Sequence, residues 1–140
     1  MRHRKHTCKL GRTGSHKRAM LANMLKSLIR HGRIETTIAK AKELKRSADR
    51  MVTLAKENTV ASRRMAASAM QLRYNPLTSK QARLAKKGDT RAYNGDRLVI
   101  GKLFGELREK FAQRKGGYTR LIRKQFQVGD SAEKCYIEYL

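Results

Sequence analysis

Apolar residues recur with the helical period in four stretches of the chain. The first helix is expected to begin with Ser15 as its N-cap and to end at Gly32, because glycine suits the position after a helix. A second helix is expected over residues 39–56, and a third over residues 60–72 with Thr59 as its cap and Pro76 ending the pattern. The fourth, over residues 96–111 with Asp96 as its cap, has the strongest apolar face. We therefore expect the fourth helix to lie in the core.

Three stretches predict strands, and the first of them contains several β-branched residues. Residues 33–38 alternate weakly, residues 118–128 follow Gly116 and Gly117, and residues 134–140 follow a turn at 129–132. The last two stretches predict a C-terminal antiparallel hairpin. The order of elements predicts an α+β fold, in which helices pack against a small three-stranded mixed sheet. A basic, irregular N-terminal arm is expected over residues 1–14.

Residues 73–95 show no convincing hydrophobic period. They are polar, basic and contain glycine, although residues 79–87 have the composition of a short exposed helix. A chain of 140 residues buries one modest core. We therefore expect a single domain over residues 15–140, with residues 73–95 as an insertion or long loop.

Charge points to a polyanionic partner. Lys and Arg number 34 against 11 Asp and Glu, a formal net charge of +23, and the first 34 residues contain no acid. Such a chain repels itself unless a polyanion neutralises it, and nucleic acid is the obvious polyanion. Two cysteines near opposite ends give no disulfide framework, which favours a reducing cytoplasm. No apolar run approaches the roughly 18 residues of a membrane span.

Other chemistries fit less well. A zinc site drawn from His3, His6, Cys8 and His16 matches no tight ligand spacing, and the surrounding cations oppose a divalent metal. The helix from Ser15 resembles a membrane-surface helix, but the C-terminal half offers a core for its apolar face. Acids are scattered and no nucleotide-binding loop is present, so we expect no enzyme, cofactor or small-molecule substrate.

The segment 115–120 is the most suggestive local motif. Gly116 and Gly117 let the backbone approach a phosphate closely, with Arg120 and a stackable Tyr118 beside them. A plain glycine turn opening a strand explains the same residues equally well. Both interpretations stay open at the level of sequence.

Several blocks spread over nearly the whole chain resemble the family of the bacterial large-subunit ribosomal protein numbered seventeen. The blocks are Met1-Arg2-His3-Arg4-Lys5, Leu10-Gly11-Arg12, Ser15-His16-Lys17-Arg18-Ala19-Met20, Asn23-Met24, Ile34-Glu35-Thr36-Thr37, Lys40-Ala41-Lys42-Glu43-Leu44 and Arg114-Lys115-Gly116-Gly117-Tyr118-Thr119-Arg120. The resemblance implies a structural protein that binds large-subunit ribosomal RNA near the peptide exit region and touches neighbouring ribosomal proteins. It implies no catalysis and no cofactor.

Charge, motif and resemblance together define the candidate RNA-binding residues. The resemblance contributes the N-terminal arm, residues 15–18, residues 40–46 and residues 115–120. The full set is Arg2, His3, Arg4, Lys5, Lys9, Arg12, Ser15, His16, Lys17, Arg18, Arg30, Lys40, Lys42, Lys45, Arg46, Arg63, Arg64, Lys115, Gly116, Gly117, Tyr118 and Arg120.

Two departures from the family pattern limit the transfer of detail. Ala39 stands where the family commonly has proline, and residues 73–95 look inserted relative to shorter members. A free-standing nucleic-acid binder or RNA chaperone is the alternative function, because charge alone does not distinguish it from a ribosomal component. An RNA-modifying or RNA-cleaving enzyme would need a cluster of catalytic groups that the sequence does not display.

Overall fold

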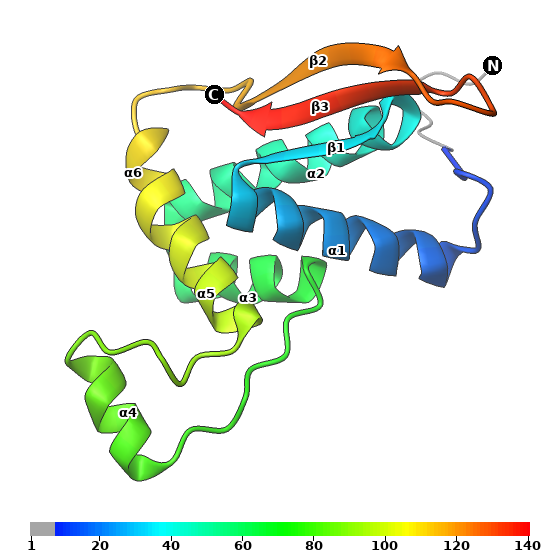
Figure 1. Cartoon of the computed structure of the whole chain (residues 1–140). Coiled ribbons are helices and arrows are strands. Elements are labelled where there is room, and N and C mark those ends of the chain that lie inside the picture. Colours follow the sequence, from blue (N-terminus) through cyan, green and yellow to red (C-terminus); the bar gives the residue numbers. More distant parts are fainter. Residues whose placement is uncertain (1–7) are drawn as a thin grey trace.

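A three-stranded antiparallel sheet lies across two long helices in the computed structural model, which describes residues 8–140 (Figure 1). The elements follow in the order α1 (Gly14–His31), β1 (Arg33–Thr37), α2 (Ile38–Glu57), α3 (Val60–Ala69), α4 (Ser79–Lys86), α5 (Gly95–Lys102), a π-helical turn (Leu103–Leu107), α6 (Arg108–Lys110), β2 (Thr119–Phe126) and β3 (Glu133–Tyr139). The predicted α+β class, its three strands and the C-terminal hairpin are confirmed.

The junction between α1 and β1 depends on Gly32. This residue has φ +75° and its N–H donates to the Leu28 carbonyl at 2.8 Å, so α1 ends where the sequence predicts. The Gly32 carbonyl then accepts from Tyr139 N–H at 3.0 Å, which ties the start of β1 to the end of β3. A left-handed residue is needed here because the chain reverses from helix to strand within one residue.

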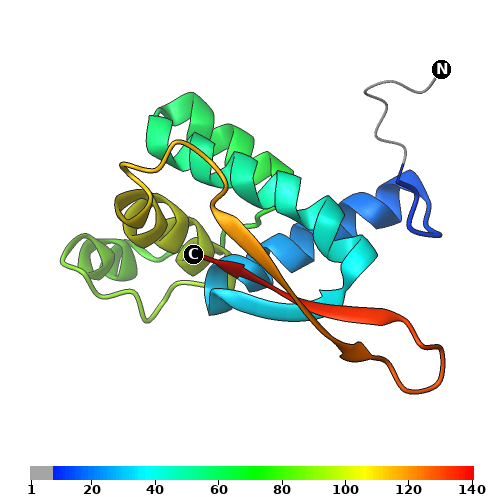
Figure 2. The same ribbon diagram turned by 90° about the horizontal axis from the view of Figure 1, so that it is seen from above.

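The sheet has the order β1-β3-β2, with both pairs antiparallel. The predicted mixed pairing is therefore wrong. The C-terminal strand inserts between β1 and β2, and α2 carries the chain back across the sheet before the hairpin forms. Ile34 pairs with Ile137 and Leu121 pairs with Ile137 from the other side, which places all three on the face that covers the helices. The hairpin turn extends beyond the helices (Figure 2).

The core lies between the inner face of the sheet and the helices. Leu28 and Ile29 of α1, Leu44 of α2, Leu103 of the π-helical turn and Ile137 of β3 are fully buried. Cys135 is also fully buried, as expected for a core strand position. The predicted fourth helix is confirmed as a core element, although its middle turn is π-helical.

Helix boundaries differ from the predictions at three places. α1 begins at Gly14 after Thr13, so Ser15 is an exposed residue of the first turn and no N-cap. α3 ends at Ala69, three residues before the predicted end at residue 72, because Gln71 adopts a left-handed conformation with φ +51°. The N-cap of α5 is Asn94, whose side chain accepts from the N–H of Arg97 at 3.0 Å, two residues before the predicted cap.

Candidate nucleic-acid interface

The starts of α1 and α2 lie side by side and carry the densest group of predicted RNA-binding residues (Figure 1). Lys17 joins them, because its ammonium lies 3.9 Å from Glu43 and donates to the Cys8 carbonyl at 2.8 Å. Lys17 therefore contacts both residue 8 and α2. We call the cations around this junction the α1–α2 basic end. Its members are Lys9, Arg12, His16, Lys40, Lys42 and Arg46, together with Arg18 on the side of α1 that faces α3.

A groove of about 470 Å³ runs along this end between α1, β1 and the first turn of α2. Arg12 and Lys40 both line it, together with Asn23 and Thr36. The Arg12 guanidinium lies 2.7 Å from Nε2 of His16, which fixes both side chains at the N-terminal end of α1. The walls also contain the Glu35 carboxylate and the apolar side chains of Met20, Met24 and Ile34, so Arg12 and Lys40, and not the groove as a whole, are the groups that suit a phosphate backbone.

The four cations predicted on α2 point in different directions. Lys42 and Arg46 are one turn apart and exposed on the side of α2 that faces away from the core. Lys45 is half-buried and shares a helix face with Asp49, which accepts a hydrogen bond from Thr119 of β2 at 3.0 Å. Lys45 thus faces the β2 side, so residues 40–46 do not form one continuous stripe.

A second basic region surrounds the loop before β2, at the opposite end of α2. Lys56 near the end of α2 donates to the Arg114 carbonyl at 2.7 Å, and Arg63 of α3 lies over the ring of Phe104 at 4.8 Å. Arg64 and Lys115 are exposed beside them. Arg46 and Lys56 are ten residues apart on α2, so about 15 Å of helix separates the nearest parts of the two regions. The structure therefore does not gather the predicted residues into a single site.

Tyr118 belongs to the core, which contradicts the stacking role predicted for it. Only 3% of its surface is exposed, and its ring packs against Phe111 with 5.2 Å between centroids. Gly116 and Gly117 are exposed, and Gly117 has φ +62°, so the glycine turn that opens the strand is present. The burial of the ring leaves the backbone of this turn and the Lys115 side chain as the groups that face outward.

The outer face of the sheet is a set of ion pairs that sequence reasoning missed. Arg120 and Arg33 both pair with Glu138, at 2.9 Å and 3.5 Å. Lys124 and Lys134 both pair with Glu35, at 2.8 Å and 3.6 Å. The signal lies in cross-strand register, which brings these residues together from distant parts of the sequence. Arg120 is therefore already partly neutralised.

The ion pairs of the sheet face shift the pKa values of Glu35 and Lys124. The hydrogen bond from Lys124 holds the pKa of Glu35 below its ordinary value, and the same bond raises the pKa of Lys124. Tyr136 lies between two cations, with Arg33 at 4.0 Å and Lys124 at 5.1 Å from its ring centroid. The outer face of the sheet is thus internally compensated, in contrast to the helix ends.

The remaining predicted residues lie apart from both basic regions or outside the described chain. Arg30 is exposed at the end of α1, where its carbonyl accepts from Lys102 at 3.0 Å. Arg2, His3, Arg4 and Lys5 of the predicted arm lie outside residues 8–140, as do two members of the imagined zinc set.

The described part of the chain lacks a metal-binding cluster and a membrane-spanning helix. Residues 8–140 contain no group of three or more His, Cys, Asp or Glu side chains placed to hold a metal ion. Within the same residues, no helix has both the length and the apolar character needed to cross a membrane.

Comparison with known proteins gives one consistent result. A family model described as Ribosomal protein L17 matches residues 20–140. The chain is 61% identical over 140 residues to a large ribosomal subunit protein bL17 of Protochlamydia amoebophila, covering all of this chain and 99% of the relative. It is 59% identical, with the same coverage, to the protein of that name from Chlamydia pneumoniae. The chain belongs to the Ribosomal protein L17 family.

Proposed function

We propose that this protein is a structural constituent of the large ribosomal subunit, where it binds and stabilises folded large-subunit ribosomal RNA by neutralising phosphates. The observation that carries the proposal is the α1–α2 basic end, a cationic surface to which the acid-free first 34 residues contribute Lys9, Arg12 and Arg18. Its relatives are named as large ribosomal subunit proteins. The proposal needs no cofactor and no chemical step, and it treats residues 15–140 as one RNA-binding domain in the cytoplasmic ribosome.

The free cations of this end are the expected phosphate contacts. Within residues 8–140, no ion pair involves Lys9, Arg18 or Lys42, and Arg46 reaches Glu43 only at 4.0 Å. Each such side chain that docks on a phosphate releases condensed counterions and adds roughly 0.7 to 0.9 to the salt slope of binding. His16 and Ser15 add hydrogen-bond donors at the same place.

The second basic region extends the proposed contact along the molecule. Arg63, Arg64 and Lys115 present cations near the C-terminal end of α2, and Lys115 is followed by the exposed backbone of Gly116 and Gly117. Two separated phosphate contacts fix the orientation of a protein on folded RNA better than one. Neighbouring ribosomal proteins are the partners expected for the surfaces that RNA leaves uncovered.

The test compares two triple variants with the same change in charge. One carries Arg18→Gln, Lys42→Gln and Arg46→Gln at the α1–α2 basic end. The matched control carries Arg33→Gln, Lys124→Gln and Lys134→Gln, which remove cations already paired on the sheet. Binding to large-subunit ribosomal RNA is measured over a range of salt concentrations.

The first variant should lower the salt slope by about two units, and the control by less than one. Equal effects would mean that only net charge matters, and would remove the case for a defined interface. Co-sedimentation with large subunits through high-salt washes separates a ribosomal component from a free-standing nucleic-acid binder. Loss of the protein in the first wash would contradict the ribosomal role.

A further inference from the structure

Residues 73–95 leave the helical layer after α3 and return at α5, carrying α4 away from the body of the protein (Figure 1). α4 buries no residue, and its long connections are largely exposed. An isolated helix of eight residues is marginal in water, because nucleation is costly and few hydrogen bonds follow. Its position must therefore be fixed by something other than a hydrophobic core.

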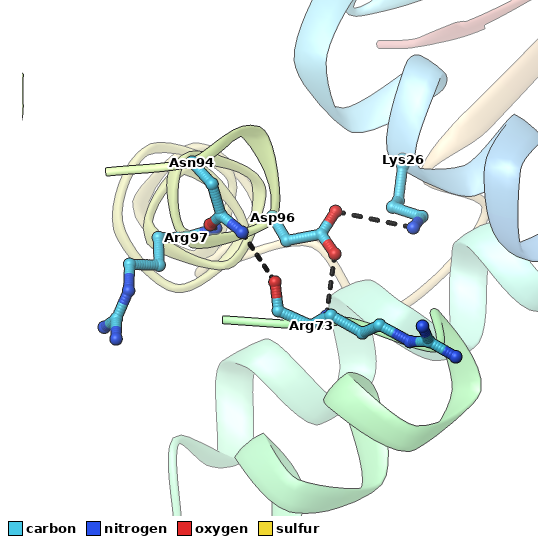
Figure 3. A network of polar contacts seen from close by, with 5 residues as sticks. All are labelled: Lys26, Arg73, Asn94, Asp96 and Arg97. Atoms are coloured by element: carbon cyan, nitrogen blue, oxygen red, sulfur yellow. Dashed lines mark hydrogen bonds and ion pairs between the residues drawn. The ribbon is translucent and has the colours of Figure 1, made fainter. Parts of the chain in front are cut away.

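A polar clasp closes the base of this excursion (Figure 3). Asp96, in the first turn of α5, accepts from the N–H of Arg73 at 2.7 Å and from Lys26 of α1 at 3.4 Å. Asn94 donates from its side chain to the Arg73 carbonyl at 2.6 Å. The outgoing and returning chains are thereby joined to each other and to α1.

A second layer of the clasp lies one step further out. Asn75 donates to the Ala92 carbonyl at 2.8 Å and accepts, through its side-chain oxygen, from the backbone of Asn94 at 3.2 Å and from Arg97 Nε at 3.1 Å. The Arg97 guanidinium also donates to the Asn75 carbonyl at 2.9 Å. Asn75 thus connects the outgoing and the returning segments of the excursion to the start of α5.

Two tyrosines complete the clasp. The Arg97 guanidinium lies 5.1 Å from the ring centroid of Tyr74 on the outgoing chain and 5.5 Å from that of Tyr93 on the returning chain. The Arg97 guanidinium is attracted to both rings, so it links the outgoing and the returning chain, although the two rings themselves are not shown in contact. The excursion therefore has a fixed direction although it buries little apolar surface.

The cations of α4 share one side of the helix. Lys80, Arg83 and Lys86, with Lys87 at the C-cap, are all exposed and fall within about a third of the helix circumference, given 3.6 residues per turn. Ala82 and Ala85 occupy the opposite side and are half-buried.

Intramolecular pairing does not use this cationic face. No ion pair in residues 8–140 involves any of the four side chains. Asp89 is the only acid of the excursion, and it accepts from the N–H of Arg91 at 3.0 Å. The α4 cations thus stay available to an external anion.

We propose that residues 73–95 form a preorganised docking arm, which places the cationic face of α4 on the phosphate backbone of ribosomal RNA outside the footprint of the two basic regions. This inference rests on the proposed function and names a further contact within it. The clasp holds the arm in its bound direction, so less conformational entropy is lost on binding. The α4 cations release counterions when they bind phosphates, and the clasp fixes the position of α4 relative to the body of the protein.

Two variants of the full chain separate these contributions. The charge variant carries Lys80→Gln, Arg83→Gln and Lys87→Gln, and the clasp variant carries Asn75→Ala. Each is tested for thermal unfolding, salt-titrated binding to large-subunit ribosomal RNA, and protection of the RNA backbone from hydroxyl radicals. Neither variant touches a core residue, so both should unfold at nearly the wild-type temperature.

The charge variant should lower the salt slope by about two units and lose a patch of backbone protection that the α1–α2 variant keeps. The clasp variant should bind a few-fold to about tenfold more weakly with an unchanged salt slope, because its charges remain.

Three outcomes are distinguishable from this pattern. Wild-type slope and full protection in the charge variant would overturn the arm while leaving the proposed function intact. Unchanged binding to naked RNA with weaker incorporation into subunits would overturn it in favour of an acidic protein neighbour. Salt-independent binding by the wild-type protein would instead refute the proposed function itself.

Discussion

Replacing Tyr118 with alanine should destabilise the fold by about 3 to 5 kcal/mol, the range for truncating a buried aromatic side chain. The side chain is 3% exposed and packs against Phe111, with the Lys56 ammonium 5.7 Å from the ring centroid. Its removal would leave a cavity where residues 111 and 118 meet the end of α2. Domains of this size have about 5 to 15 kcal/mol of total stability, so the loss is a large share of it.

Thermal and urea unfolding measure this loss. For a chain of this length the melting temperature should fall by roughly 10 to 20 °C, at about 3 to 5 °C per kcal/mol. Phe126→Ala, at the end of β2, is the matched control for Tyr118, which directly precedes this strand, because the Phe126 side chain is 65% exposed. The control should change stability by less than about 1 kcal/mol. Similar small losses in both variants would show that Tyr118 is not a core residue.

Tyr118→Leu tests RNA binding without a large cavity. Leucine keeps an apolar side chain in the core but removes the aromatic face, so affinity for ribosomal RNA should stay within about twofold. Stacking of a base on an aromatic ring is worth about 1 to 3 kcal/mol, which corresponds to roughly 5- to 150-fold in affinity. A folded leucine variant that binds tenfold more weakly would refute the core assignment and restore the stacking role.

Three further predictions concern other parts of the fold. Burial raises the pKa of the Cys135 thiol, so a thiol reagent should modify it only on unfolding, while the other cysteine reacts in the native protein. Because the Lys124 hydrogen bond lowers the pKa of Glu35, its stabilising effect is present above the ordinary pKa of 4.5 and is lost as pH falls through the lowered value. Glu35→Gln should therefore flatten the acid decline in melting temperature. Thr59→Ala breaks the capping box of α3 and should cost about 1 kcal/mol, whereas Thr78→Ala should leave global unfolding unchanged, because α4 buries no residue.

Local signals predict most of the elements. The helical period and Gly32 define α1, and the period of apolar residues defines α2 and the core helix. Thr59 was expected to cap α3 and does so through a reciprocal capping box with Ser62. These features depend on residues a few positions apart, so a single sequence contains the information.

The predictions of helix boundaries and strand pairing are wrong where contacts between distant residues, or an unusual backbone conformation, determine the structure. Aspartate is a preferred N-cap residue, but the Asp96 carboxylate accepts hydrogen bonds from Arg73 and Lys26, and Asn94 is the cap instead. The end of α3 depends on the left-handed conformation of Gln71. Because this residue is not a glycine, the sequence does not indicate that conformation. The direction of β1 relative to the hairpin depends on how α2 crosses the sheet, and the period of a strand contains no such information.

The candidate site shows the same limit. Lysine and arginine content locates the basic surfaces, but whether a cation is free depends on the fold. Arg120 was predicted from a glycine motif, yet the register of β2 with β3 places it against Glu138. Tyr118 was predicted from the same motif, yet packing against Phe111 removes its ring from the surface. Composition thus predicts the class of partner, and the three-dimensional arrangement decides which side chains reach it.

The distribution of the few acids follows from how strongly the backbone forces cations together. In the sheet, register fixes Arg33 and Arg120 on either side of residue 138, and like charges on neighbouring strands destabilise a sheet. Glu138 and Glu35 occupy the positions where such repulsion would be greatest. Long side chains at helix ends can instead extend apart into solvent, where the repulsion is screened. Within residues 8–140, Lys9, Arg18 and Lys42 therefore fold without acidic partners, and they are the cations left free to bind phosphate.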